Sequence, residues 1–355
     1  MAIYLDYAAT TPADDKVIEA MCGCMKLANP SSPYGAAAAA RRQMRLARQF
    51  ISRMLHVDVA ALYFTSGGSE TDAWAMTYSP HAAVSAVEHA SILNSAPNAV
   101  RIPADANGLI TAQAVARSLT PDTQLVSVQW ANNETGVIHP IEEIYRVVKA
   151  HGAKLHVDAV QAFGHVPVDA RYCDMMTLSA HKLYGPRGAG CLYVRPGVDL
   201  KPLIPGGGQE GGWRGGTENV PAICGFGVAA QLAQADLEAR AQRERALMAG
   251  FLAQIAVPGA YPLSADAPRL PGVAALYLPG LPAEIAIAKL DLLGVEVSGG
   301  AACHSRSAAP SHVYQAMGLS EAEAKHVIRI SIGRGVDEAQ LTAAADAFNR
   351  VYTQK

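Results

Sequence analysis

One lysine, Lys182, lies in a stretch whose residue types could carry out covalent chemistry. An apolar run at 175–178 leads into Ser179, His181 and Lys182, and a loop rich in glycine and proline separates it from a second apolar run at 191–194. The pattern predicts two short strands that present the lysine in a tight turn between them. A buried ammonium group is costly and its pKa shifts readily, so such a lysine suits a Schiff base with an aldehyde cofactor. A turn lysine exposed by its glycine neighbours fits this stretch equally well.

An aspartate at the end of the preceding apolar strand bears on the choice between a Schiff-base lysine and an exposed turn lysine. Asp158 closes the run Leu155-His-Val-Asp158, and no basic partner lies close to it in the sequence. Pyridoxal phosphate needs a carboxylate at its ring nitrogen, so that the protonated ring can withdraw electrons. Taken alone, Asp158 fits equally well as a strand-end residue that caps the next helix. The aspartate and Lys182 together favour the cofactor site.

A third segment indicates a site for an anion. Residues 61–65 are expected to form a strand, and Ser66-Gly-Gly-Ser-Glu70 opens the following helix. Small residues and free backbone N–H groups at a helix start bind anions. Serine followed by glutamate is also an ordinary helix-opening signature. The order strand, glycine, helix favours phosphate over a simple cap.

Cys303 stands in a run of small residues near the C-terminal end. The run Ser298-Gly-Gly-Ala-Ala-Cys-His-Ser305 offers few apolar neighbours that could bury the thiol. An exposed thiol can ionise and act as a nucleophile, whereas the cysteines at 22, 24, 173, 191 and 224 lie in apolar or helical contexts. Cys22-Gly-Cys24 is read as incidental rather than as a redox or metal element. The histidines show no metal-binding spacing, and no metal site is expected.

These motifs together resemble the cysteine desulfurases of the NifS/IscS type, a pyridoxal phosphate-dependent group within the class V aminotransferases. The resemblance is carried by His156-Val-Asp-Ala-x-Gln161 and by Ser179-x-His-Lys-x-Tyr-Gly-Pro-x-Gly188. It runs from Tyr4-Leu-Asp-Tyr-Ala-Ala-Thr-Thr-Pro12 to Ile328-Arg-Ile-Ser-Ile-Gly333. The family implies an α/β protein with the type I fold of pyridoxal phosphate-dependent transferases.

The resemblance also implies how the chain is divided. Residues 14–240 would form a large cofactor-binding domain with a mostly parallel sheet of the seven-stranded type. Residues 1–13 and 241–355 would form a smaller α+β domain, which carries the catalytic cysteine loop at about 298–312. A homodimer is expected, because Thr217 matches a residue that reaches the cofactor phosphate of the partner subunit.

The resemblance further assigns roles to the candidate residues. Lys182 would carry the cofactor and move protons once the substrate amine displaces it. Asp158 would pair with the ring nitrogen, and Gln161 would lie near the phenolic oxygen. His89 matches the histidine that stacks on the ring and assists proton transfer, although a histidine after a strand is, without the family, more often structural. The phosphate-binding positions would be Gly68, Ser69, Ser179, His181 and Thr217.

Two residues are assigned to the substrate. Asn133 matches an asparagine near the cofactor oxygen and the substrate carboxylate. Arg329, on an otherwise apolar strand, fits a bidentate clamp for that carboxylate. A strand-edge arginine in a salt bridge is the alternative for Arg329.

In the reaction that the resemblance implies, Cys303 attacks the sulfur of cofactor-bound L-cysteine, which leaves a Cys303 persulfide and L-alanine. The sulfur would pass to an acceptor protein, either an iron–sulfur scaffold or a tRNA-thiolating enzyme. A selenocysteine lyase or aminotransferase of class V would account for Lys182, Asp158, His89 and Arg329, but not for the exposed Cys303. A non-catalytic interaction subunit would keep the lysine site for no evident reason. Tyr34, Ala73 and His304 depart from the family pattern, which leaves the acceptor and the choice between cysteine and selenocysteine open.

The elements around these residues are expected to form a parallel sheet. Strands at 83–87, 125–130 and 154–157 alternate with helical segments such as 141–150, which is typical of helices on both faces of a sheet. Ligands bind beyond the carboxyl ends of such strands, where His89, residues 132–134 and Asp158 fall. The glycine-rich stretch 206–216 is read as a loop and not as a dinucleotide site.

Composition excludes several classes of protein. The chain has 355 residues, half of them hydrophobic and 17% charged, which favours a large core over disorder. A net charge of −2 offers no footprint for nucleic acid. No apolar run approaches the roughly 18 residues of a membrane span, and the first residues lack the pattern of a signal peptide. We expect a reduced, cytoplasmic protein with no membrane partner.

Overall fold

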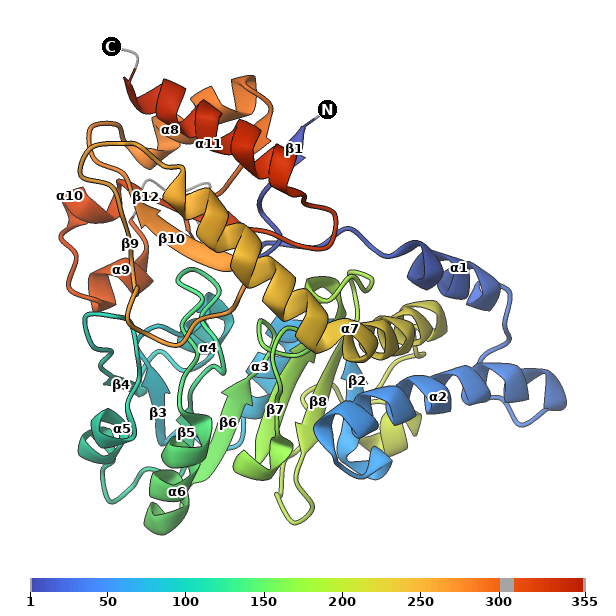
Figure 1. The fold of residues 1–355 in the computed structure, drawn as a ribbon. Coiled ribbons are helices and arrows are strands. Elements are labelled where there is room, and N and C mark those ends of the chain that lie inside the picture. Colours follow the sequence, from blue (N-terminus) through green and yellow to red (C-terminus); the bar gives the residue numbers. More distant parts are fainter. Residues whose placement is uncertain (1, 301–309, 354–355) are drawn as a thin grey trace.

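A central sheet of seven strands forms the larger part of the molecule (Figure 1). The computed structural model describes residues 2–300 and 310–353, so Cys303 and His304 lie outside the described residues. The strands lie side by side in the order β2 (Leu62–Thr65), β8 (Gly190–Val194), β7 (Met175–Ser179), β6 (Lys154–Asp158), β5 (Leu125–Ser127), β3 (Ala82–Ser85) and β4 (Val100–Ile102). Within the sheet only β8 runs antiparallel to its neighbours. The predicted mostly parallel, seven-stranded sheet is confirmed.

Helices cover both faces of this sheet. They are α1 (Asp15–Cys24), α2 (Ala38–Leu55), α3 (Gly68–Met76), α4 (Ala90–Ser95), α5 (Ala112–Ser118), α6 (Ile141–His151) and the start of α7 (Val220–Ala253). The sequence of α6 explains its bounds. Two glutamates stand in its first turn, Lys149 and His151 stand in its last turn, and Gly152 ends it with a φ of 91°. Such charges complement the helix dipole, and glycine adopts that backbone conformation without strain.

Strands β3 and β5 are shorter than the sequence pattern predicts. The expected strands at 83–87 and 125–130 end at Ser85 and Ser127. Beyond β5 the backbone still bonds to β6, since the N–H groups of Val128 and Trp130 donate to the carbonyls of His156 and Asp158. The chain therefore stays beside the sheet while it leaves regular pairing, and the residues that follow line a pocket at this edge.

The smaller part of the molecule is built from the two ends of the chain. Its strands are β9 (Tyr261–Pro262), β10 (Val273–Tyr277) and β12 (Val327–Ser331) in one antiparallel sheet, with β1 (Ile3–Tyr4) paired to β11 (Val295–Glu296). Its helices are α8 (Ala283–Leu292), α9 (His312–Ala316), α10 (Glu321–Ala324) and α11 (Glu338–Thr353). Leu5, Ile328 and Phe348 belong to one apolar cluster here, which is separate from the clusters around the large sheet.

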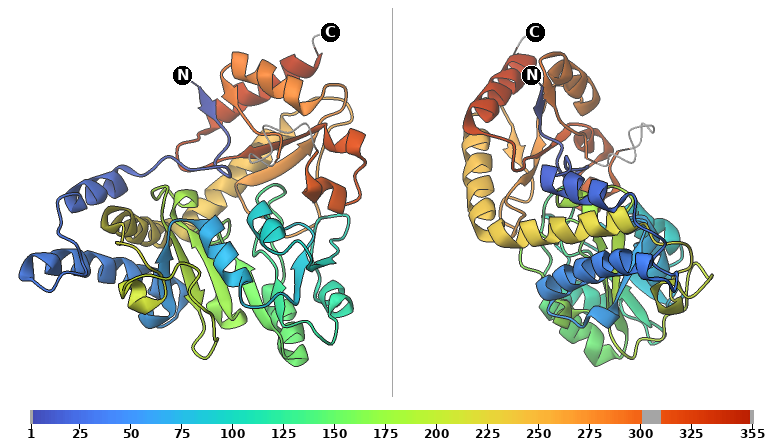
Figure 2. Two further views of the ribbon diagram at one scale, coloured as in Figure 1. Left: turned by 180° about the vertical axis from the view of Figure 1, so that it is seen from behind. Right: turned by 90° about the vertical axis from the view of Figure 1, so that its right-hand side faces the viewer.

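Helix α7 belongs to both parts. Its first half lies alongside α1 and α2 (Figure 2), and its second half places Met248 and Phe251 in the apolar cluster of the smaller part. By length and mean hydropathy alone it resembles a membrane span, but 56% of its most apolar window is buried inside the protein. Contact with two other helices accounts for this apolar character, because a helix that is covered on several sides needs apolar residues on several sides.

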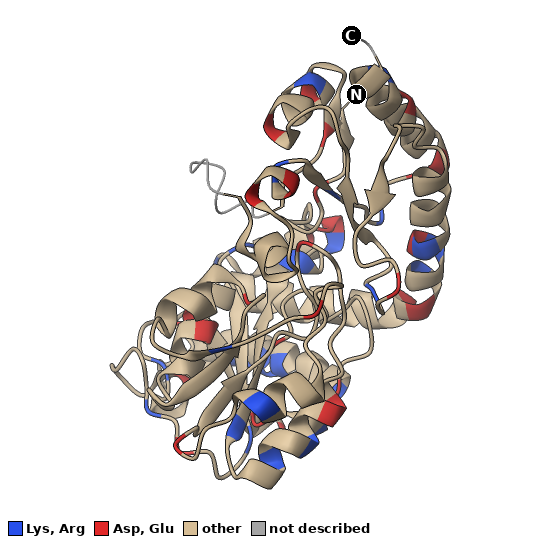
Figure 3. Ribbon diagram, turned by 90° about the vertical axis from the view of Figure 1, so that its left-hand side faces the viewer, with Lys and Arg blue, Asp and Glu red and all other residues tan. Residues whose placement is uncertain are grey.

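Glu244 is a buried carboxyl group on α7 that makes the stability depend on pH. Acidic and basic residues are interspersed along the helices of both parts (Figure 3), and Glu244 itself is 3% exposed beside Arg240 and Arg243. Burial raises its pKa from 4.5 to about 7, and the arginines only partly oppose this. The folded protein therefore holds a proton that the unfolded chain releases, so stability is lost as the pH rises from about 4.5 through about 7.

Glu244→Gln is therefore expected to be more stable than the wild type at pH 8 and about equal to it at pH 4.5. The upper limit of the gain is about 3 kcal/mol, since each pKa unit corresponds to about 1.36 kcal/mol. Urea unfolding at both pH values measures the effect. Glu238→Gln, an exposed neighbour on the same helix, is the control and should show no such difference. A gain for Glu244→Gln of the same size at both pH values would contradict the assignment.

Candidate active site

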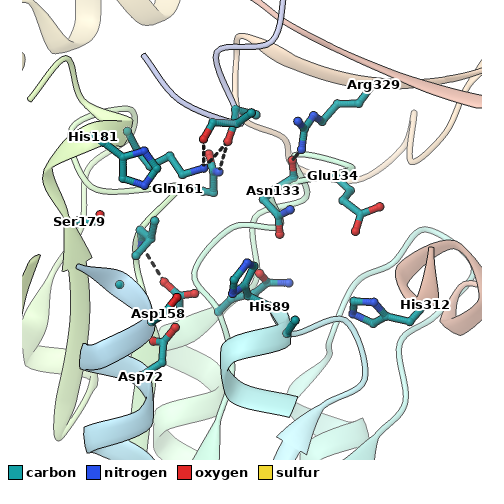
Figure 4. Close-up of a pocket in the computed structure, with 18 residues that line it drawn as sticks. Asp72, His89, Asn133, Glu134, Asp158, Gln161, Ser179, His181, His312 and Arg329 are labelled. Carbon is teal, nitrogen blue, oxygen red and sulfur yellow. Dashed lines mark hydrogen bonds between the residues drawn. The ribbon is translucent and has the colours of Figure 1, made fainter. Parts of the chain in front are cut away.

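A pocket lies at the carboxyl ends of the parallel strands, beside the smaller part of the molecule (Figure 4). Its cavity measures about 240 Å³. Ten residues that the sequence predicts for the site line it: Gly68, Ser69, His89, Asn133, Asp158, Gln161, Ser179, His181, Lys182 and Arg329. Thr217 does not line this pocket, and Cys303 lies outside the described residues.

Lys182 reaches the pocket from the turn after β7. Its amine donates hydrogen bonds to the backbone carbonyls of Ala8, at 2.5 Å, and Ala9, at 2.8 Å. Residues 180–182 form a short 3-10 turn, and the backbone carbonyl of Lys182 contacts Nε2 of His165 at 2.7 Å. The lysine is thus held on both sides and points into the cavity, rather than lying exposed in a glycine-rich turn.

The first residues of the chain form one wall of the pocket. The amide of Gln161 donates to the carbonyl of Ala8 at 2.8 Å, and the N–H of Ala8 donates to the hydroxyl of Ser331 at 2.8 Å. Thr11 exchanges hydrogen bonds with the turn, because its N–H and hydroxyl donate to the carbonyl of His181. This N-terminal segment therefore joins the lysine turn to β12.

Asp158 is buried at the end of β6. Its Oδ1 accepts a hydrogen bond from the N–H of Val160 at 2.8 Å, so it does cap the following turn as well as face the cavity. Burial raises its pKa to about 6, which the Val160 N–H and the charge of Lys182 oppose. A buried carboxylate of this kind is stabilised by a protonated nitrogen placed against it.

The start of α3 provides backbone donors at the opposite wall. Gly67 occupies the cap position and, having no side chain, makes no side-chain capping hydrogen bond to the first turn. Helix starts without such a cap leave N–H groups for an anion. The strand beside this turn needs a glycine, because a Cβ on Gly190 would stand 2.6 Å from the Thr65 hydroxyl and 2.7 Å from the Gly67 backbone.

Two more polar groups converge on the same wall. The Ser179 hydroxyl is buried and has no hydrogen-bond partner among the described residues. His181 contacts the Thr10 hydroxyl through Nδ1 at 3.1 Å, and its pKa is lowered to about 4, mainly by burial. An orphaned hydroxyl and an uncapped helix start fit a phosphate group.

Arg329 is buried on β12 above the cavity. One guanidinium nitrogen donates to Asp6 Oδ1 at 2.6 Å, and another donates to the carbonyl of Asn133 at 3.0 Å. Its Nε has no partner among the described residues. The salt bridge suggested as an alternative is therefore present, and Arg329 also lines the pocket.

His89 lines the pocket directly before α4. Its Nδ1 contacts the hydroxyl of Ser91 at 2.6 Å and accepts the N–H of Ser91 at 3.2 Å, so the ring caps the helix. The same hydroxyl lies 2.6 Å from Asp72 Oδ2. Capping gives His89 the structural role considered for it, and the ring still faces the cavity.

Several pocket residues are not predicted from the sequence. They are Ala8, Ala9, Asp72, Ala90, Gln129, Val160 and His312, whereas Glu134 falls within the residues 132–134 expected at the strand ends. Asp72 lies in α3 one turn after Ser69, and this spacing is a signal that places both residues on one helix face. His312 is the first residue of α9, and no motif in the sequence assigns it to the site. The carbonyls of Ala8 and Ala9 carry no sequence signal, because every residue has one.

The chain is similar to known proteins over nearly its whole length. The family model for class V aminotransferases matches residues 3–343. The cysteine desulfurase IscS 1 of Archaeoglobus fulgidus is 37% identical over 351 residues, which cover 93% of this chain and 92% of that protein. The putative cysteine desulfurase IscS 1 of Bacillus subtilis is 37% identical over 365 residues, or 97% and 96% of the two chains. A solved NifS-like protein from Rickettsia africae has a TM-score of 0.91 at 32% identity, with 99% of both chains covered.

Proposed function

We propose that the pocket around Lys182 is the active site of a cysteine desulfurase. The premise is that this chain belongs to the class V aminotransferase family. The chain is a pyridoxal phosphate-dependent enzyme of the NifS/IscS type, and it converts L-cysteine to L-alanine with transfer of the sulfur. The observation that carries the proposal is that Lys182, Asp158 and the open helix start of α3 converge on one cavity. A selenocysteine lyase, an aminotransferase or a non-catalytic subunit is not favoured.

The residues of the pocket fit the cofactor. Lys182 supplies the amine that binds its aldehyde, and Asp158 supplies the carboxylate for its ring nitrogen. Gly68, Ser69, Ser179 and His181 surround the place for its phosphate. When bound, pyridoxal phosphate withdraws electrons from the α-carbon of an amino acid, which allows bonds at that carbon and the next one to break. His89 would face its ring, and Gln161 and Asn133 would hold its oxygen.

The remaining steps belong to side chains of this protein. Arg329 binds the substrate carboxylate and is held for this by Asp6. Lys182 and His89 carry protons to and from the substrate. Cys303 in its thiolate form attacks the sulfur of the substrate, so that an S–S bond forms as the C–S bond breaks. Alanine is released after protonation, and the sulfur stays on Cys303 as a persulfide.

Incubation of the purified protein with L-cysteine tests the proposal. Equal amounts of alanine and of protein-bound sulfur are expected in a single turnover, with a mass gain of about 32 Da, one sulfur atom, on the Cys303 peptide. A keto acid product would indicate an aminotransferase instead. A cofactor-loaded protein that forms alanine from selenocysteine but not from cysteine would indicate a lyase. Neither product from either amino acid would overturn the enzyme assignment.

The division into domains and the assembly are also part of the proposal. A large domain at 14–240 and a small domain from 1–13 and 241–355 are supported by the separate apolar clusters that α7 joins. A homodimer is supported by Thr217, which matches a family residue at the cofactor phosphate and does not line the pocket of its own chain. Thr217 would then reach the partner subunit's cofactor phosphate. Sedimentation of the purified protein at the mass of two chains is the expected result.

The sulfur acceptor is proposed to be a cytoplasmic protein, either an iron–sulfur scaffold or a tRNA-thiolating enzyme. Relatives named IscS support the first of these. Transfer of labelled sulfur from the Cys303 persulfide to each purified acceptor compares the two directly. Equal, slow transfer to both acceptors and to an unrelated thiol protein would contradict both.

Arg329→Lys tests the substrate clamp. Lysine keeps the charge beside Asp6 but loses the paired donors that match a carboxylate. The KM for L-cysteine is expected to rise about 10- to 100-fold, because a hydrogen bond to a charged group contributes about 1.5–3 kcal/mol. Steady-state kinetics measures the change. Arg195→Lys is the control, since Arg195 binds backbone carbonyls such as that of Cys173 and does not line the pocket. An unchanged KM in Arg329→Lys would remove the clamp role.

A further inference from the structure

We propose that Asp72 and Ser91 form a proton relay that ends at Nδ1 of His89. The relay allows the His89 ring to donate and accept protons at the pocket while the ring remains neutral. This inference rests on the proposed function, because it concerns how His89 moves protons during the reaction. Asp72 and Ser91 act through His89 and are therefore positioning residues, whereas His89 itself faces the substrate.

The three side chains form one continuous chain of short contacts. Asp72 is 1% exposed in α3, and its Oδ2 lies 2.6 Å from the Ser91 hydroxyl. The same hydroxyl lies 2.6 Å from His89 Nδ1. Asp72 and His89 both line the pocket, and they come from α3 and from the start of α4, which pack together. Figure 4 shows both side chains on the wall below the cavity.

The direction of these hydrogen bonds follows from one backbone contact. The N–H of Ser91 points at His89 Nδ1 from 3.2 Å, and an N–H can only donate. Nδ1 is therefore an acceptor, and the Ser91 hydroxyl can donate to it as well. An ionised Asp72 would accept the hydroxyl proton of Ser91 at Oδ2. The hydroxyl has one proton, so when it donates to Nδ1 instead, it can only accept toward Asp72. The hydrogen on the contact between Asp72 and Ser91 then belongs to Asp72, which is a protonated carboxylic acid.

The surroundings of Asp72 support the protonated form. Burial raises its pKa well above the usual value and the nearby carboxylate of Asp158 raises it further, whereas hydrogen bonds with the hydroxyls of Ser91 and Thr177 oppose this rise. The Nε2 of His156 stands 3.9 Å from Asp72 Oδ1, but burial lowers the pKa of His156 to about 3, so this ring is neutral. Glu88 is also buried nearby with a pKa well above the usual value. Lys182 lies on the far side of Asp158, whose pKa it lowers.

A neutral imidazole whose Nδ1 accepts carries its proton on Nε2. When Nε2 gives this proton to the substrate, Nδ1 takes the hydroxyl proton of Ser91, and Ser91 takes the proton of Asp72. The ring remains neutral, and the negative charge rests on Asp72. The reverse sequence lets Nε2 accept a proton from the substrate and returns Asp72 to its acid form. Every proton is accounted for, and no free imidazolate or imidazolium is required.

Infrared spectroscopy of the protein without substrate tests the resting state. The wild type at neutral pH is expected to show the carbonyl band of a protonated carboxylic acid that Asp72→Asn lacks. Glu88→Gln is the matched control, because Glu88 is an equally buried carboxyl group that interacts with backbone N–H groups and not with Ser91. It should remove a different band and leave the Asp72 band in place. Identical spectra of the wild type and Asp72→Asn would overturn the inference.

Kinetics with L-cysteine tests the relay. Asp72→Asn keeps a donor toward Ser91, and so keeps the position of the ring, but its amide cannot release a proton. The kcat is expected to fall about 10- to 100-fold with an unchanged KM. This is less than the roughly 100- to 10,000-fold that a general acid–base group contributes, because the His89 ring itself remains. Ser91→Ala should show the same loss, Ser91→Thr should restore the rate by restoring the hydroxyl, and Glu88→Gln should retain it.

The two parts of the inference can fail separately from the proposed function. Full kcat in both Asp72→Asn and Ser91→Ala would overturn the relay while leaving a desulfurase. A wild type that makes no alanine would overturn the function, and the infrared comparison would still determine the state of Asp72. If Asp72→Asn fails to fold, the pair Ser91→Ala and Ser91→Thr carries the kinetic test alone.

Discussion

Replacement of Lys182 by alanine is expected to lower the rate of alanine formation from L-cysteine at least about 10³-fold, since it removes both the covalent anchor and a proton carrier. The visible absorption band of the lysine-bound cofactor should disappear as well. Borohydride reduction of the wild type should leave the cofactor on the Lys182 peptide, which mass spectrometry identifies. Both results follow from the position of the amine inside the cavity.

Two further measurements make this prediction specific. Lys201→Ala removes an exposed lysine that pairs with Asp199 at the surface, and it should keep both the absorption band and the rate. A small primary amine added to Lys182→Ala should recover part of the activity, because it can occupy the vacated space and carry protons. Activity of Lys182→Ala above a tenth of the wild type would mean that another amine holds the cofactor.

Replacement of Cys303 by serine is expected to separate cofactor binding from sulfur transfer. The absorption band should remain, whereas alanine formation should fall at least about 10²-fold, because a hydroxyl is a far weaker nucleophile than a thiolate at neutral pH. No sulfur should be found on the protein after incubation with L-cysteine. The roles of Lys182 and Cys303 are therefore distinguished by the spectrum and not only by activity.

Cys22→Ser is the control for this experiment. Cys22 is an exposed thiol on α1 and could react with released sulfur without any part in the reaction. Its replacement should leave the rate and the yield of Cys303 persulfide unchanged. If Cys303→Ser turned over at the wild-type rate, the nucleophile would have to be found elsewhere in the chain.

The residues predicted from the sequence are those whose position follows from strand order. Asp158 and His89 each come after a buried parallel strand, and the carboxyl ends of such strands meet at one edge. Lys182 follows the strand beside Asp158, so the same rule places it there. The motifs shared with a known family then assign expected roles to the residues at these positions, as they do for Gln161 and Arg329.

The residues that were missed depend on packing between elements. Asp72 reads as an ordinary aspartate in the first turns of a helix, and its meaning arises only because α3 packs against α4. In the sequence Ser91 is an ordinary serine at the start of a helix, and its contact with the His89 ring appears only in the structure. For Arg329 the structure shows the salt bridge with Asp6 and a place in the pocket lining, and the clamp for the substrate carboxylate stays a prediction. Sequence patterns describe single elements, and these groups belong to pairs of elements.

The pairing of β1 with β11 has a consequence for the synthesis of the chain on the ribosome. Ala8 and Ala9 supply the carbonyls that hold Lys182. The strand before them pairs with Val295 and Glu296, and Asp6 pairs with Ser331. At about 5–20 residues per second, the N-terminal segment waits roughly 15–65 s for these partners to emerge. The lysine pocket is therefore completed last, and a truncated nascent chain lacks a finished cofactor site. An extension fused before β1 would for the same reason alter the active site.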